Sequence, residues 1–429
     1  MRPHGTRDAT DRTAPPAMVT GGCRACGVGD VRPLLDFGPQ PPSNRFVTAQ
    51  DGHDDRHPLV LGQCQRCGLL QLVNPMPPAM VRPRYGWLTY NEPEGHLDTL
   101  VAQLRGFLPD GDRASLLGVT YKDDTTLTRF RAAGYDRVRR LDPAAAGVQT
   151  PHAGIETLQA ALTARLGAEL ARREGPADLV VARHVLEHAH RPHQLMECLV
   201  ELTTPGGLLA VEVPDAAKFV RTADYCYLWE EHIAYFSEQT LRAFFGYHGA
   251  EVVGVWRYPY PAEDSLVAVV RRPVAGRRSD AAGSYPWLET ELQSGRHFAE
   301  RFEETRRAYG SHLSHLHAQG KRIAVFGAGH LAVKFINLLD LSAGIVYVID
   351  DNPHKTGLVM PGSRLPIVGS AVLYDDKIDL CLLSLSPENE ARVITRHQAY
   401  LDGGGVFRSV FALSPLALWR DIQGRGGRR

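Results

Sequence analysis

Two pairs of cysteines near the start of the chain have a spacing suited to metal binding. Cys23 and Cys26 lie in "CRACG", and Cys64 and Cys67 lie in "CQRCG". A CxxC turn presents two thiolates side by side, and two such turns complete the tetrahedral sulfur set that structural zinc prefers. The alternative is two free or redox-active CxxC motifs. The spacing favours zinc held by all four cysteines, in a role that supports folding.

A glycine-rich turn near the C-terminus is the second motif. The run "KRIAVFGAGHLA" ends with Gly327, Gly329 and Ala332 in the pattern GxGxxA, between an expected strand and an expected helix. An acid, Asp350 or Asp351, follows about twenty residues later, as in dinucleotide-binding folds. Three readings stay open: NAD(P) binding, docking of a diphosphate or nucleotide-sugar at the helix N-terminus, and a purely structural turn.

The stretch "SLLGVTYKDD" (115–124) lies where a nucleotide-binding glycine loop would be expected. Only Gly118 is present, and Lys122, Asp123 and Asp124 replace the other small residues. This loop is either a solvated turn or a new polar site in the cofactor pocket. Asp142, in "VRRLDP", follows the next expected strand, at the position where an acid hydrogen-bonds a ribose.

Short strand-like runs alternate with helical patterns through the middle of the chain. This alternation predicts a mostly parallel sheet covered by helices. A second strand–turn–helix pattern begins near residue 320. The expected strands are 115–120, 137–141, 178–183, 207–213, 251–256 and 265–271, and the expected helices are 94–107, 125–133, 156–173, 192–203 and 238–247.

Length and composition are those of a globular protein with several domains. The chain has 429 residues, 44% of them hydrophobic, with 48 basic and 48 acidic side chains. The charge balance gives no field to recruit nucleic acid or an anionic membrane. No membrane-spanning run or secretory signal is recognised, so we expect a cytoplasmic protein. The expected parts are a disordered leader (1–20), a zinc module (21–80), a central domain (81–273), a linker and helix (274–319), a C-terminal domain (320–415) and a basic tail (416–429).

The central domain carries the residues of a family resemblance. A strand-like run is followed by "RHVLEH" and, after a helix, by a "PGG" turn. This stretch resembles class I S-adenosylmethionine (SAM) methyltransferases. The four cysteines in front, "EEHIAYFS" (230–237) and the C-terminal unit extend the resemblance to nearly the whole chain. In this order, the parts resemble the sugar C-methyltransferase family.

The resemblance implies a fold and an activity. The fold is α/β: a class I methyltransferase-like Rossmann domain with an N-terminal zinc module and a second, Rossmann-like C-terminal domain. The activity is SAM-dependent C-methylation of a keto deoxysugar linked to a nucleotide. Glu231 and His232 match the family's catalytic residues. His232 would remove a proton beside the ketone, and the enolate would accept the methyl group of SAM.

The resemblance also implies binding residues, since the ends of the strands in such sheets face their ligands. The expected SAM-binding residues are Gly118, Asp123, Asp124, Asp142, Arg183 and His184. The expected substrate-binding residues are Tyr85, Tyr90, Gly327, Gly329 and Asp351.

Two departures from the family pattern keep an alternative open. Trp229 stands where the family has a tyrosine, and Glu230 where it has a histidine. The loop 118–124 lacks the usual acid and glycine pair. The alternative function is a methyltransferase-like protein that does not methylate, either an epimerase or isomerase of sugar nucleotides or a non-catalytic binding protein. The sequence does not indicate an oligomeric state.

Overall fold

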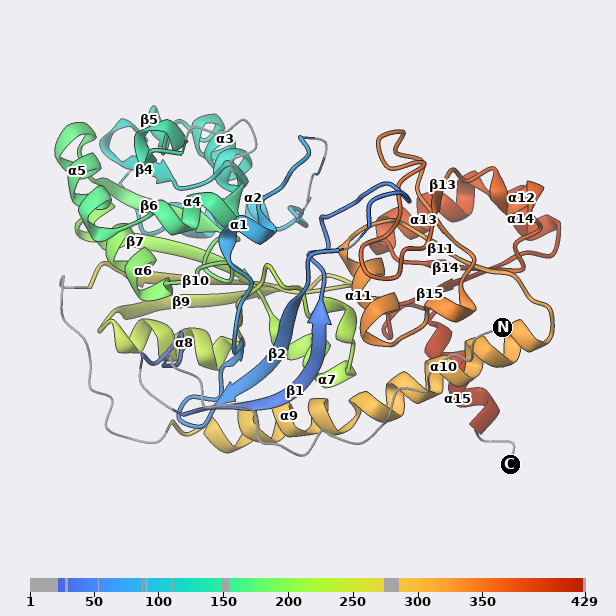
Figure 1. Ribbon diagram of the computed structural model, residues 1–429. Coiled ribbons are helices and arrows are strands. Elements are labelled where there is room, and N and C mark those ends of the chain that lie inside the picture. Colours follow the sequence, from blue (N-terminus) through green and yellow to red (C-terminus); the bar gives the residue numbers. More distant parts are fainter. Residues whose placement is uncertain are drawn as a thin grey trace.

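The computed structural model describes residues 22–27, 30–52, 54–86, 88, 92–109, 111–148, 154–273 and 285–426. Tyr90 and the leader 1–20 lie outside these residues. Three sheets lie along the molecule, with the N-terminal sheet between two larger α/β domains (Figure 1). Within the described ranges, no helix combines the length and the apolar character that crossing a membrane requires.

The N-terminal sheet is antiparallel and has the order β1-β2-β3-β8. Its first three strands belong to the cysteine-rich module, but β8 comes from the central domain, more than 160 residues later in the chain. This sheet therefore joins the zinc module to the central domain. Its strands are β1 (Val31–Gln40), β2 (His57–Cys64), β3 (Leu70–Leu72) and β8 (Ala234–Tyr235).

The central sheet has the order β5-β4-β6-β7-β10-β9. Its first four strands are parallel and β10 and β9 are antiparallel, and the runs expected as strands all lie in it. The six strands are β4 (Ser115–Gly118), β5 (Arg137–Arg140), β6 (Ala177–Arg183), β7 (Thr203–Pro214), β9 (Glu251–Tyr258) and β10 (Ser265–Arg271). The helices of this half are α1 (Pro78–Val81), α2 (Leu97–Arg105), α3 (Asp124–Ala132), α4 (Ile155–Ala161), α5 (Ala164–Glu174), α6 (Pro192–Leu202), α7 (Ala216–Thr222) and α8 (Glu238–Tyr247).

The C-terminal sheet is parallel, with the order β13-β12-β11-β14-β15. Two successive helices, α9 and α10, run from the central domain to this domain (Figure 1). The segment expected as a basic tail begins with a helix whose Leu418 is fully buried. The elements are α9 (Leu288–Glu300), α10 (Phe302–Ala318), β11 (Ile323–Phe326), α11 (His330–Leu338), β12 (Tyr347–Ile349), β13 (Ile367–Val368), α12 (Val372–Asp375), β14 (Leu380–Leu383), α13 (Pro387–Arg396), α14 (Gln398–Asp402), β15 (Val406–Ser409) and α15 (Leu418–Gly426).

Candidate functional site

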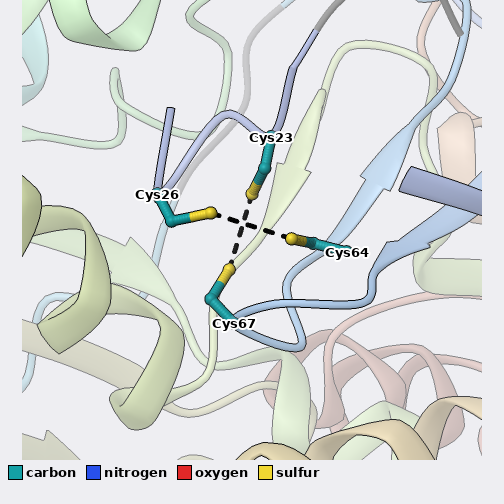
Figure 2. Close-up of side chains that lie close together, drawn as sticks. All are labelled: Cys23, Cys26, Cys64 and Cys67. Atoms are coloured by element: carbon teal, nitrogen blue, oxygen red, sulfur yellow. Dashed lines mark hydrogen bonds between the residues drawn. The ribbon is translucent and has the colours of Figure 1, made fainter. Parts of the chain in front are cut away.

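The four cysteines converge as the sequence predicts (Figure 2). The sulfur atoms of Cys23 and Cys67 are 3.5 Å apart, and those of Cys26 and Cys64 are 3.8 Å apart. Four sulfurs placed about 2.3 Å from a zinc ion in a tetrahedron are roughly 3.8 Å from one another. The cluster therefore has the dimensions of a closed structural zinc site.

The chemistry of the cluster also fits a cation. All four cysteines are free thiols and are buried, and burial raises the pKa of Cys23. Several thiolates gathered without water repel one another unless a metal ion neutralises them. Cys23, Cys26, Cys64 and Cys67 would thus hold Zn²⁺, with no coordination position left for catalysis.

A cavity of about 390 Å³ lies between the three parts of the chain. The zinc module contributes Ser43 and Phe46, and the central domain contributes His184 and His232. The C-terminal domain closes the opposite side through the turns that follow its strands. Those turns contribute Gly329, His330, Asn352, Lys355, Ser384, Ser386 and Asn389.

His232 is held beside the cavity by backbone hydrogen bonds on both sides of the chain. The amides of Ile233 and Ala234 donate to the Glu187 carbonyl at 2.7 and 3.2 Å. The Leu72 amide donates to the Ile233 carbonyl at 2.9 Å, and β8 then pairs with β3. The segment after His232 is thereby fixed to the "HVLEH" motif and to the zinc module.

This arrangement brings His232 together with two residues that the sequence analysis did not nominate. A carboxylate oxygen of Glu187 and one ring nitrogen each of His188 and His232 lie within 4.8 Å of one another. The rings of His188 and His232 meet edge to face, with centroids 4.8 Å apart. Burial, with the neighbouring His188, holds the pKa of His232 well below its usual range. The His232 imidazole is therefore neutral at physiological pH and can accept a proton.

The three residues before His232 contact the flanking domains. Trp229 stacks on His330 of the C-terminal domain at 4.3 Å between ring centroids. Glu230 forms a fully buried ion pair with Lys334 of α11 and also accepts a hydrogen bond from the Ser43 hydroxyl at 3.1 Å. Glu231 accepts a hydrogen bond from the Asn44 side chain at 3.0 Å and is not among the cavity-lining residues. Its assignment as a catalytic residue stays a prediction.

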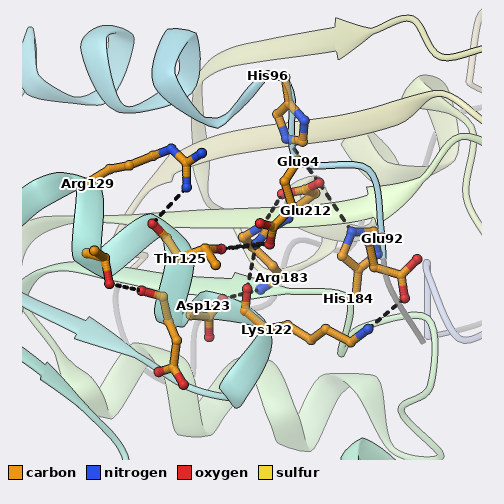
Figure 3. A network of polar contacts seen from close by, with 12 residues as sticks. Glu92, Glu94, His96, Lys122, Asp123, Thr125, Arg129, Arg183, His184 and Glu212 are labelled. Carbon is orange, nitrogen blue, oxygen red and sulfur yellow. Dashed lines mark hydrogen bonds and ion pairs between the residues drawn. The ribbon is translucent and has the colours of Figure 1, made fainter. Parts of the chain in front are cut away.

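The residues expected to bind SAM divide into two groups, and the first is engaged within the protein (Figure 3). The Asp123 carboxylate is fully buried and accepts hydrogen bonds from the backbone amides of Val119, Thr120 and Arg183 at 2.7 to 2.9 Å. A side chain at Gly118 would collide with Asp123 and Leu127. The absence of a side chain at Gly118 thus serves the packing of the loop on itself.

Arg183 and Lys122 complete this buried network. The Arg183 guanidinium is 1% exposed and pairs with Glu212 of β7 at 2.5 Å. The Lys122 ammonium pairs with Glu92 at 2.8 Å, whereas the neighbouring Tyr121 side chain is 47% exposed. Lys122 and not Tyr121 therefore fills space near the end of the sheet.

The second group is reachable by a ligand. Asp142, at the end of β5, is exposed, and only its Oδ1 caps the following turn, at 3.0 Å from the Ala144 amide. Asp124 is half exposed and pairs with Arg140 at 3.0 Å. His184 lines the central cavity, and the carboxylates of Glu187 and Glu212 outweigh burial and raise its pKa to about 10. The assignment of Asp142 to the ribose of SAM stays a prediction, whereas Asp123 is occupied by the backbone amides of its own loop.

The expected substrate-binding residues also differ in whether they line the cavity. Gly329 lines the cavity with open space around its α-carbon, and Gly327, at φ 105°, lets the chain turn closely against Ser384 and Leu385. Asp351 hydrogen-bonds Ser370 instead of facing the cavity. The Tyr85 hydroxyl donates to the Phe46 carbonyl at 2.6 Å, which places this tyrosine behind the cavity wall.

The residues that sequence reasoning missed differ in the signal that was available for them. Glu187 and His188 belong to the recognised "HVLEH" motif, so that motif was the available signal. His330, Lys355 and Glu263 come from three separate parts of the chain, and only the packing of the domains brings them to one cavity.

The chain matches three family models in succession. Residues 23–81 match a zinc binding domain, residues 95–255 match a methyltransferase domain, and residues 289–412 match the C-methyltransferase C-terminal domain. Together these matches cover the zinc cluster, the central sheet and the C-terminal sheet.

The chain is also similar to individual proteins. It is 29% identical to the C-methyltransferase NovU of Streptomyces niveus in an alignment 403 residues long, which covers 90% of this chain and 94% of NovU. Among solved structures, a SAM-dependent methyltransferase from Anabaena variabilis matches 42% of this chain and 86% of its own, with 15% identity and a TM-score of 0.30. A Burkholderia thailandensis 1,6-didemethyltoxoflavin-N1-methyltransferase with bound S-adenosylhomocysteine matches 42% and 78%, with 17% identity and a TM-score of 0.27. At these TM-scores the two structures support no detailed assignment. The methyltransferase domain, flanked by the other two matched domains, and the similarity to NovU along nearly the whole chain show that the protein is a SAM-dependent methyltransferase that resembles C-methyltransferases.

Proposed function

We propose that the protein methylates a carbon atom beside the ketone of a keto deoxysugar carried on a nucleoside diphosphate. The observation that carries this proposal is the cavity between the two α/β domains. One side of it presents His232, and the other presents the polar turns of the C-terminal domain. A sugar nucleotide has two ends that suit these two sides: a ketone with an acidic C–H bond and an anionic diphosphate.

The polar side has the chemistry of an anion site. The N-terminus of α11 opens at Gly329, where an added Cβ would meet only open space. Backbone amides at a helix N-terminus attract phosphate groups. The Lys355 ammonium lines the same wall and is fixed by the Asp350 carboxylate and the Ala328 carbonyl, both at 2.8 Å. A diphosphate there would leave the sugar pointing toward His232.

Asp350 has a different role from the acid of a dinucleotide fold. Its Oδ2 accepts a hydrogen bond from the Ala328 amide at 3.0 Å, within the glycine turn itself. A carboxylate occupied in this way stabilises the turn and is less available to a ribose. This favours a diphosphate over NAD(P) as the occupant of the C-terminal domain.

His232 acts as the general base in this proposal. Its neutral imidazole takes the proton from the carbon beside the ketone, and the electron pair of that C–H bond moves into an enolate. The lowered pKa keeps the base form available below pH 6.5, the usual value for histidine. SAM, when bound, supplies the methyl group that the enolate carbon accepts.

Proton exchange tests the base without requiring methyl transfer. The protein would be incubated in D₂O with a panel of nucleoside diphosphate 4-keto-6-deoxyhexoses, and deuterium beside the ketone would be followed by NMR. We expect His232→Ala to slow exchange by about 10²–10⁴-fold. His317→Ala, an exposed histidine on α10, is the matched control. Wild-type exchange in the His232→Ala variant would refute the assignment of the base.

A further inference from the structure

An enolate that forms in the site needs a hydrogen-bond donor at its oxygen. The tyrosine of the family pattern could supply one, but this chain has no tyrosine at that position. Trp229 occupies the position of the family's tyrosine, and its indole stacks on His330. We propose that Glu263 is a further catalytic residue whose carboxyl group donates a hydrogen bond to the substrate's carbonyl oxygen as the enolate forms. This inference rests on the proposed function, since it assigns a second group to the same reaction.

The turn between β9 and β10 presents Glu263 to the cavity. Ala262, Glu263, Asp264 and Ser265 all line the cavity that His232 lines. The Asp264 carboxylate accepts hydrogen bonds from the Lys218 ammonium at 2.7 Å and from the Tyr260 amide at 3.0 Å. These contacts hold the turn in a defined conformation. The Glu263 side chain can therefore face a substrate bound in the cavity.

Glu263 differs from the other carboxyl groups around the cavity. Glu92 pairs with Lys122 and Asp264 pairs with Lys218, so both have a cation beside them. Within the part of the chain that the structure describes, no hydrogen bond or ion pair engages the Glu263 carboxyl. A carboxyl group without a cation in a largely enclosed site favours its neutral form, which carries a proton to donate.

The surrounding charges act in the same direction. Burial, followed by the nearby Glu92, raises the pKa of Glu263 to about 8, with further contributions from Glu187 and Asp215 and an opposing one from His184. Roughly nine tenths of Glu263 is then protonated at pH 7, and the donor form is lost as the pH rises through about 8. A neutral acid in an apolar site is an effective oxyanion donor.

Two of the three nearby tyrosines are already engaged within the protein. The Tyr225 hydroxyl donates to the Phe298 carbonyl at 2.7 Å, and the Tyr235 hydroxyl donates to the Trp229 carbonyl at 2.9 Å. Tyr227 lines the cavity, and its buried hydroxyl has no hydrogen-bond partner among the described residues. Tyr227 is therefore the alternative donor, and the substitutions below separate it from Glu263.

His232 and Glu263 together account for the proton and the electron pairs that move when the enolate forms. His232 gains the proton of the C–H bond, the carbon electron pair forms a C=C bond, and the carbonyl π pair moves onto oxygen. Glu263 keeps its own proton and shares it with that oxygen. When the carbon atom forms its new bond, the C=O bond returns and the hydrogen bond weakens.

Two substitutions at Glu263 test the donor role, with kcat and KM measured from about pH 6 to pH 10 on the same sugar-nucleotide panel. Glu263→Ala should lower kcat by about 10²–10³-fold while KM changes little. Glu263→Gln retains an N–H donor that does not titrate, so it should keep kcat within about tenfold and lose the decline near pH 8. Glu251→Ala, an exposed acid on β9, is the matched control for the hairpin.

Each other outcome would overturn the proposal. Glu263→Gln as inactive as Glu263→Ala would mean that a carboxylate, not a donor, is needed. A loss of kcat in Tyr227→Phe with an unaffected Glu263→Ala would assign the donor to Tyr227. An active wild type with an unaffected Glu263→Ala refutes this inference alone, whereas a wild type that exchanges no proton refutes the proposed function as well.

Discussion

At the scale of single residues, Glu187 connects His184 to the segment that follows His232. Its Oε1 lies 3.2 Å from His184 Nδ1, and its backbone carbonyl accepts the amides that follow His232. His184 has a positive φ of 49°, which is strained for a histidine and persists because Glu187 and Glu212 hold its ring. A single glutamate thus fixes a charged histidine on one side and the neutral His232 on the other.

We expect the Asp142 carboxylate to hydrogen-bond the ribose of SAM. It is exposed at the end of β5, and only one of its oxygens has a role in the fold. Asp142→Ala should weaken SAM binding by about tenfold, because a charge-assisted hydrogen bond contributes roughly 1.5 kcal/mol. Isothermal titration calorimetry with SAM measures the effect. Asp136→Ala, an exposed acid just before the same strand, should bind SAM as the wild type does.

At the scale of elements, the segment 229–232 is held from two sides. Its Trp229 and Glu230 contact α11 of the C-terminal domain, and its Glu230 and Glu231 contact the zinc module. Glu230 stands where the family pattern has a histidine, and its carboxylate is paired with Lys334. The cavity exists because this segment joins all three parts of the chain.

The buried pair of Glu230 and Lys334 should therefore be important for stability. Both side chains are 0% exposed, so Lys334→Met would leave a carboxylate buried without its cation. We expect the free energy of unfolding to fall by about 3–5 kcal/mol. Adding Glu230→Gln should restore most of that loss, because the remaining group is neutral. Urea denaturation measures both variants.

The control for this prediction is an exposed pair in the same domain. Lys321 pairs with Asp379 at 2.8 Å, with the lysine half exposed. Lys321→Met should cost less than about 1 kcal/mol, since surface ion pairs contribute little. Equal losses in Lys321→Met and Lys334→Met would contradict the special role of the buried pair.

At the scale of the whole molecule, the sequence predicts the parts better than their contacts. The cysteine spacing predicts the metal cluster, and hydrophobic periodicity predicts the strands of the central sheet, because both are local patterns. The helix expected at 156–173 is instead two helices, with Thr163 capping the second. Contacts such as Glu230 with Lys334 depend on the docking of distant segments, which no local pattern encodes. The family motif pointed to His232, which lines the cavity, whereas no motif pointed to Glu263, which lines it too.

Zinc should influence catalysis through the architecture of the whole chain, although the cluster lies apart from the cavity residues. Cys64 ends β2, β2 pairs with β3, and β3 pairs with β8, which begins two residues after His232. Cys64→Ser should lose the zinc, loosen this sheet and slow the proton exchange that depends on His232. Hydrogen–deuterium exchange at Ile233 to Tyr235 should rise at the same time. Cys381→Ser, a buried thiol in the C-terminal sheet, should retain about one zinc per chain by elemental analysis. If Cys64→Ser loses its zinc but residues 233–235 stay protected, the coupling through β3 and β8 is wrong, because the segment after His232 would then be held without the metal.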